Sequence, residues 1–296
     1  MPLTLRLILY PAFAFFCLLV FSILLFPFDS LKNRFEGEIE KGLGGGFSVT
    51  VGKISPALLS GVTLKNLEIR SKKNDAKVKL ERAKLKIALF PLLWGKKNIS
   101  LAVKSGPSSI EGRMIIGKET LRLDLDLDKM DIAIGRILTS LSLPLAGTIS
   151  GQIKLDLYPT DPLRNAGKVH LVFPDFRLDE GATLGGFPLP SVMLSKGDSS
   201  GIDIEVNRGN WEVKLFKFEG GDLQLEAVGK VFAARRIENY RWNLQGTFQP
   251  APGSEEKLSF LSLVGDQKGE DGKYPLSISG KLSKPAIRIG TFQLPI

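Results

Sequence analysis

The sequence of 296 residues contains a single cysteine, Cys17, and a single histidine, His170. One thiol cannot form an internal disulfide. A structural zinc site needs several Cys or His ligands, and a Ser-His-Asp triad needs a histidine as its base. Any such chemistry would depend on His170, which lies between Val169 and Leu171 in the polar phase of a predicted strand, where we expect a surface or structural role. We therefore predict no enzymatic activity, no catalytic residue and no bound metal or cofactor.

No charged residue occurs between Arg6 and Asp29. The apolar run over residues 7–26 has the length of about 20 residues that a helix needs to cross a bilayer. It exceeds the apolar core of a cleaved signal peptide, and no small-residue cleavage site follows it. Residues 1–28 are therefore predicted to be a short cytoplasmic tail and an uncleaved transmembrane anchor, with Cys17 inside the span.

The orientation of this predicted span rests on the short tail, because the basic residues flanking it are nearly balanced. A short N-terminal tail stays easily in the cytoplasm, while a long C-terminal domain is translocated largely regardless of its charge. We expect a single-pass protein of a bacterial inner membrane with its C-terminal domain in the periplasm. A domain without thiols suits that oxidising compartment.

The positive charge is concentrated between Val62 and Lys104, where twelve Lys or Arg residues stand against three acidic residues. A basic segment close to a membrane anchor favours contact with anionic lipid headgroups. The same side chains would equally suit the solvent face of strands or the protection of a sheet edge. Nucleic acid is not a predicted partner, because the sequence shows no recognition-helix pattern. The candidate lipid contacts are Lys72, Lys73, Lys77, Lys79, Lys84 and Lys86.

Apolar periodicity predicts a short amphipathic helix and a glycine linker over residues 29–46, followed by a β-rich domain over residues 47–296. The clearest strand is Leu121–Asp128, in which leucines alternate with charged residues. Residues 77–87 alternate with a one-residue slip at Glu81–Arg82, which predicts a β-bulge. Residues 130–142 have helical spacing and predict one helix within the domain. Residues 251–273 are polar, with Leu258–Val264 as the stretch that could pack.

A glycine followed by a polar and an apolar residue recurs in the predicted strands, at Gly147, Gly151, Gly229, Gly246 and Gly280. This repeat favours a long, curved, antiparallel sheet that bends where the glycines lie. Such a sheet would present an apolar groove, although ordinary sandwich packing would use the same alternation. Asp124, Asp126 and Asp128 would line the opposite, solvated face, because a straight strand cannot make carboxylates converge on calcium. The candidate groove residues are Leu121, Leu123, Leu125, Leu127, Ile153, Leu155, Leu157, Trp242 and Leu244.

The order of these features resembles the type II secretion system protein N (GspN) family, most clearly in residues 26–32, 49–67 and 143–155. The run over residues 49–67 is also similar to the segment that follows the anchor in AsmA-like and TamB-like proteins. The first resemblance implies a structural or assembly component of type II secretion that contacts other components of that machine. The second implies, as an alternative, a β-groove that binds or conducts phospholipid between the membranes. Neither resemblance implies catalytic residues.

Overall fold

The computed structural model describes most of the chain after the predicted span. The described residues are 18, 21, 32–42, 46–57, 61–72, 77–87, 97–132, 144–181, 183–184, 187–188, 190–234, 239–258, 261–262, 264–281 and 284–294. Within these ranges, no helix combines the length and the hydrophobicity that crossing a bilayer would require. The predicted span lies outside them except for Leu18 and Phe21, which are helical and exposed. The chain divides into two compact units, Met1–Ile87 and Ala88–Ile296.

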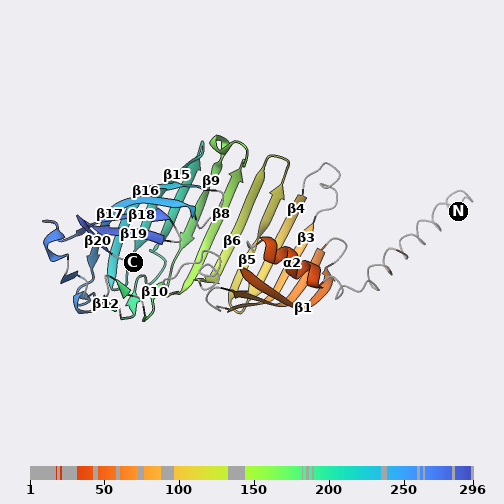
Figure 1. Ribbon diagram of the computed structural model, residues 1–296, viewed down its shortest axis with the longest axis horizontal. Coiled ribbons are helices and arrows are strands. Elements are labelled where there is room, and N and C mark those ends of the chain that lie inside the picture. The colour runs from red at the N-terminus through yellow and green to blue at the C-terminus, as the bar shows by residue number, and fades with distance from the viewer. Residues whose placement is uncertain are drawn as a thin grey trace, which may run out of the picture. The chain divides into compact units, whose positions relative to one another are not determined.

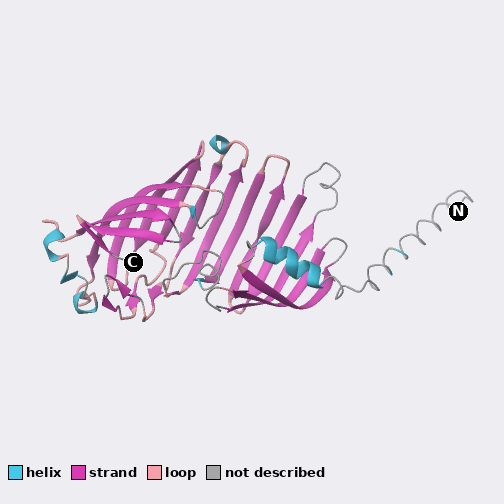
Figure 2. Cartoon of the chain, viewed as in Figure 1, coloured by secondary structure: helices cyan, strands magenta, loops and turns pink. Residues whose placement is uncertain are grey.

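Antiparallel strands dominate both units, which confirms the predicted mainly β class (Figures 1 and 2). Fifteen strands form the main ladders, in the order β1-β2-β3 in the first unit and β4-β5-β6-β8-β9-β14-β15-β16-β17-β18-β19-β20 in the second. β13, β10 and β7 form a small second sheet, and β11 pairs with β12.

The first unit contains α2 (Lys32–Gly42), β1 (Phe47–Ala57), β2 (Gly61–Ser71) and β3 (Lys77–Ile87). The second unit begins with β4 (Lys97–Ser105), β5 (Ser108–Ile116), β6 (Leu121–Asp131), β7 (Leu145–Ala146), β8 (Thr148–Leu157), η2 (Pro162–Arg164), β9 (Ala166–Val172), β10 (Arg177–Leu178), β11 (Thr183–Leu184), β12 (Phe187–Pro188) and β13 (Val192–Met193). It continues with β14 (Gly201–Asn207), β15 (Asn210–Phe218), β16 (Leu223–Phe232), β17 (Arg241–Pro250), η4 (Glu255–Lys257), η6 (Gly265–Gln267), β18 (Tyr274–Lys281), β19 (Lys284–Ile289) and β20 (Phe292–Leu294).

The helix α2 supplies hydrogen-bond acceptors to β1, the terminal strand of its ladder. The Glu36 and Glu40 carboxylates accept hydrogen bonds from the backbone N–H groups of Val51 and Val49, at 2.7 and 2.8 Å. Glutamates four residues apart share one face of a helix, and alternate N–H groups of a strand point to the same edge. The spacing of the two elements therefore matches, and the helix occupies backbone donors that a free edge would expose.

The slip in alternation at Glu81–Arg82 is shared by all three strands of the first unit. Gly52, Asn66 and Glu81 are each skipped in the pairing, while Val51, Leu67 and Leu80 remain in register on one side of the interruption. Asn66 has the left-handed φ of 52° that accommodates the extra residue. The slip is therefore not the single-strand bulge that the pattern predicted, because one extra residue in each strand leaves the register unchanged.

The core of the second unit lies between the apolar face of its sheet and the segments that cover it. Phe173 and Phe176, from the segment between β9 and β10, pack against Phe218 of β15 with ring centroids 5.8 and 5.5 Å away. Leu258 and Val264, between β17 and β18, are buried with residues of β17 to β19. The polar segment 251–273 thus carries part of the core.

Of the helix predicted near residues 130–142, the described residues show helical structure at Ile132 only. Met130 and Asp131 belong to β6, which continues past Asp128 through a bulge between Leu127 and Met130. Lys129 takes a left-handed φ of 46° at that bulge, and its N–H donates to the Ser150 hydroxyl. Residues 133–143 lie outside the described residues.

Candidate functional site on the apolar face

The strand register joins the predicted groove residues into continuous apolar rows. Leu123 and Leu155 are direct cross-strand partners, and their row extends to Trp242. From β4 to β19 this row is Ile99, Met114, Leu123, Leu155, Gly167, Val206, Trp211, Val231, Trp242, Gly280 and Pro285. The neighbouring row is Leu101, Gly112, Leu125, Ile153, Val169, Ile204, Val213, Gly229, Leu244, Ile278, Ile287 and Leu294.

The other predicted groove residues extend the same face along the strands. Leu121 pairs with Leu157, and Leu127 pairs with Ile110 of β5 and Gly151 of β8. All nine candidates therefore lie on one face of the second unit's sheet. Of the glycines in the repeat, Gly229 and Gly280 lie in the two rows given above, Gly151 and Gly246 share a third row, and Gly147 lies between β7 and β8. They therefore do not form the single line that the repeat suggested.

The burial of this face changes along the sheet. Leu244 in β17 is only 1% exposed and Val213 in β15 only 2%, because the covering segments pack on them. In β6 the side chains of Leu121, Leu125 and Leu127 remain partly exposed, as do Ile99 and Leu101 in β4. Leu123, Ile153 and Leu157 pack against the core cluster, and Leu155 of β8 is a buried member of that cluster at 8% exposure. The face is thus closed at β15 to β17 and accessible at β4 to β6.

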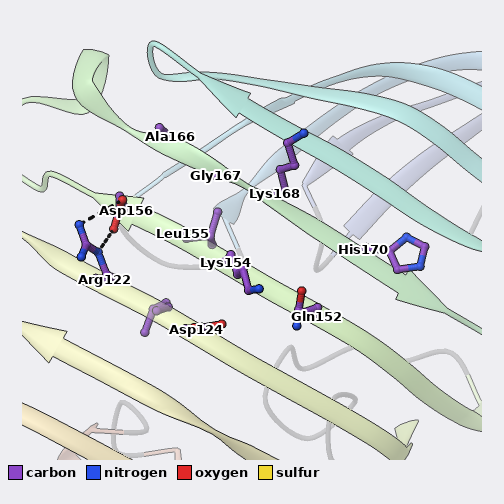
Figure 3. Close-up of a pocket in the computed structure, with 11 residues that line it drawn as sticks. Arg122, Asp124, Gln152, Lys154, Leu155, Asp156, Ala166, Gly167, Lys168 and His170 are labelled. Carbon is purple, nitrogen blue, oxygen red and sulfur yellow. Dashed lines mark hydrogen bonds and ion pairs between the residues drawn. The ribbon is translucent and has the colours of Figure 1, made fainter.

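The opposite face carries charged pairs between neighbouring strands (Figure 3). Arg122 of β6 donates to the Asp156 carboxylate of β8, at 2.5 Å from Nε and 3.5 Å from Nη2. This hydrogen bond raises the pKa of Arg122. Lys168 of β9 lies 3.6 Å from Glu205 of β14. Arg122, Asp124, Lys154, Asp156 and Lys168 are among the residues that line an open depression of about 530 Å³ on this face.

His170 is an exposed member of that polar face. Its Nδ1 lies 2.5 Å from Asp203 Oδ1 on the adjacent strand. Asp124 stands opposite Lys154, and Asp126 accepts a hydrogen bond from Gln152. Nowhere in the described ranges do three or more His, Cys, Asp or Glu side chains gather as a metal site would require. The polar face is best explained as a ladder of mutually paired charges.

The predicted lipid-contact lysines lie mainly on β3. Lys77, Lys79, Lys84 and Lys86 are exposed there, Lys72 is exposed just after β2, and Lys73 lies outside the described residues. The register adds a row that the sequence did not reveal. Lys53, Lys65 and Arg82 are direct neighbours on β1, β2 and β3, and all three are exposed. Only strand pairing could have identified this row, since its members are far apart in the chain.

Comparison of the chain with protein-family models, with curated proteins and with solved structures found no match. The resemblance to the type II secretion N family and to AsmA-like proteins therefore stays a prediction.

Proposed function

We propose that this protein binds the acyl chains of a lipid along the accessible part of its apolar face, over β4, β5 and β6. The observation that carries the proposal is the change in burial along continuous apolar rows. Val213 and Leu244 are closed under covering segments, whereas Leu125 in the same row remains partly exposed. An apolar surface that stays accessible to solvent commonly marks a binding site.

The chemistry of the rows favours a lipid as the occupant. In β4 to β6 the rows that contain Leu123 and Leu125 contribute only apolar side chains and Gly112. An extended protein segment on this surface would leave its own backbone N–H and C=O groups without partners, at a cost in free energy. An acyl chain has no such groups. The predicted membrane anchor would keep the protein beside a source of lipid.

Photocrosslinking in cells tests this function. A photoreactive amino acid at Leu125 should give lipid adducts, which mass spectrometry of the purified protein would identify. The matched control is Asp126, the next residue of β6, whose side chain lies on the polar face. Adducts confined to the protein itself at Leu125 would mean a closed core and would contradict lipid binding.

A structural role in type II secretion is the second proposal, and it rests on the resemblance alone. Deletion of the gene separates the two functions. Loss of protein export with an intact lipid barrier would favour the secretion role. A leaky outer membrane with normal export would favour lipid binding.

A further inference from the structure

We propose a second binding site, for an amphiphile with an oxyanion headgroup, at the rim of the sheet where β16, β17 and β18 end. An open cavity of about 610 Å³ lies there, within the range of ligand pockets. Phe232, Arg241, Trp242, Gly280 and Lys281 line it. The site is distinct from the accessible face at β4 to β6, and its occupancy does not depend on the function proposed above.

Both faces of the sheet contribute to this cavity. Trp242 and its cross-strand partner Gly280 belong to the apolar row described above. Phe232, Arg241 and Lys281 form the next row, which is also in register. The cavity lies where β16 and β18 end and β17 begins, and residues of both phases line it there. The rim therefore combines an apolar wall with a cationic wall.

The basic side chains of the cationic wall are not paired with carboxylates of the described residues. Arg241 and Lys281 are cross-strand neighbours, and Lys284 follows in the same row on β19. All three side chains are exposed, and no carboxylate from the described part of the chain lies within 4.0 Å of them. The charges on the polar face of β6 to β14 are paired across strands, as Arg122 is with Asp156. A planar guanidinium and an ammonium side by side suit a phosphate or carboxylate group.

The apolar wall consists of Trp242 and the bare backbone of Gly280. The indole Nε1 of Trp242 is buried, so Trp242 offers a ligand apolar surface and no polar contact from its indole N–H. Phe232, which is 54% exposed at the same cavity, offers apolar surface to the rest of the ligand.

Quenching of tryptophan fluorescence tests the site in the full-length protein, held in a neutral detergent. The probe is 9,10-dibromostearate, whose bromine atoms quench nearby indoles, and its matched control is the uncharged methyl ester. The signal from Trp242 is the quenching that disappears in the Trp242→Phe variant. We expect dibromostearate to quench Trp242 at a concentration at least tenfold lower than the methyl ester does.

The charge variants Arg241→Gln and Lys281→Gln, alone and combined, identify the headgroup contact. Both side chains are exposed, so we expect these variants to keep the circular dichroism spectrum of the wild-type protein. The combined variant should lose the preference for the acid over the ester. Equal quenching by the two probes in the wild-type protein would overturn the proposal. Full displacement of dibromostearate by millimolar inorganic phosphate would also overturn it, since the site would then select a free anion.

Discussion

At the scale of single residues, Gly151 shows how closely the strands of the second unit approach each other. Its φ is 139°, and a Cβ atom at this position would overlap the carbonyl oxygen of His170 on β9. A backbone with a positive φ of this size is adopted almost only by glycine, and it costs other residues about 1–3 kcal/mol of conformational strain. The recurrence of glycine in the sequence marked this position, but only the φ value and the contact explain it.

The variant Gly151→Ala should therefore lower the melting temperature by several degrees, through strain and overlap. Gly37 is the matched control, because it lies within α2 and a Cβ atom there would meet nothing within 4 Å. Alanine in a helix interior is favoured over glycine by about 1 kcal/mol, so Gly37→Ala should leave the melting temperature unchanged or raise it. Thermal unfolding followed by circular dichroism measures both. Equal effects of the two variants would contradict the assigned backbone at Gly151.

Asp222 gives the second prediction for a single residue, because it joins three segments through one carboxylate. The carboxylate accepts hydrogen bonds from Lys257 at 2.8 Å, from the Met193 N–H at 2.8 Å and from the Ser254 hydroxyl at 3.1 Å. Burial raises the pKa of Asp222, but these hydrogen bonds outweigh burial and hold the pKa below its ordinary value. A lowered pKa in the folded state means that the charged form stabilises the fold.

This stabilisation is complete above the unfolded-state pKa of about 3.9, and it is lost as the pH falls through the lower folded-state pKa. The stability of the wild-type protein should therefore fall more steeply below about pH 4 than that of Asp222→Asn, which cannot titrate at this position. Urea unfolding across this pH range measures the two slopes. Parallel slopes would show that Asp222 does not couple folding to protonation.

At the scale of elements, the pairing of α2 with β1 protects the terminal strand of the first unit. Glu36 and Glu40 occupy the N–H groups of Val51 and Val49. The double variant Glu36→Ala/Glu40→Ala should expose these donors, so the amides of Val49 and Val51 should exchange hydrogen faster and the protein should associate through β1. Hydrogen exchange and size-exclusion chromatography measure the two effects.

Glu38 is the matched control for this helix, because its carboxylate is exposed and bridges to Lys41 at 3.4 Å on the same helix. Glu38→Ala should leave amide exchange in β1 and the oligomeric state unchanged. If all three alanine substitutions together accelerate exchange no more than Glu38→Ala does, the two carboxylates do not hold the edge.

Apolar periodicity in the sequence predicts some strands correctly and misses where others end. Strict alternation in Leu121–Asp128 predicts β6 correctly, because a face of leucines opposite charges is stable only as a half-buried strand. The extension of β6 to Asp131 escapes the pattern, since the Leu127/Met130 bulge breaks the alternation and leaves spacing that suits a helix. The capping of β1 by Glu36 and Glu40 was also invisible, because a contact between helix and strand depends on tertiary packing.

At the scale of the whole second unit, the sequence predicts the existence of an apolar face but not where it is covered. Alternation assigns Leu125 and Leu244 to one face, and the structure places them in the same row. Their different burial arises from segments distant in the chain, such as those carrying Phe176 and Val192. These segments have no simple period, so the rim cavity and the accessible face emerge only from the fold.

The contrast between Leu125 and Leu244 yields the last prediction. Leu244→Ala empties a site that is 1% exposed, and such substitutions cost about 2–5 kcal/mol, which should lower the melting temperature markedly. Leu125→Ala removes a partly exposed side chain and should cost less stability. Leu125→Gln adds a polar group to the accessible face and should reduce lipid adducts formed from a photoreactive residue at Leu127, while the melting temperature stays near that of wild type. If Leu125→Gln instead destabilises the protein as strongly as Leu244→Ala does, the face at β6 is part of a closed core, and the lipid would have to bind elsewhere.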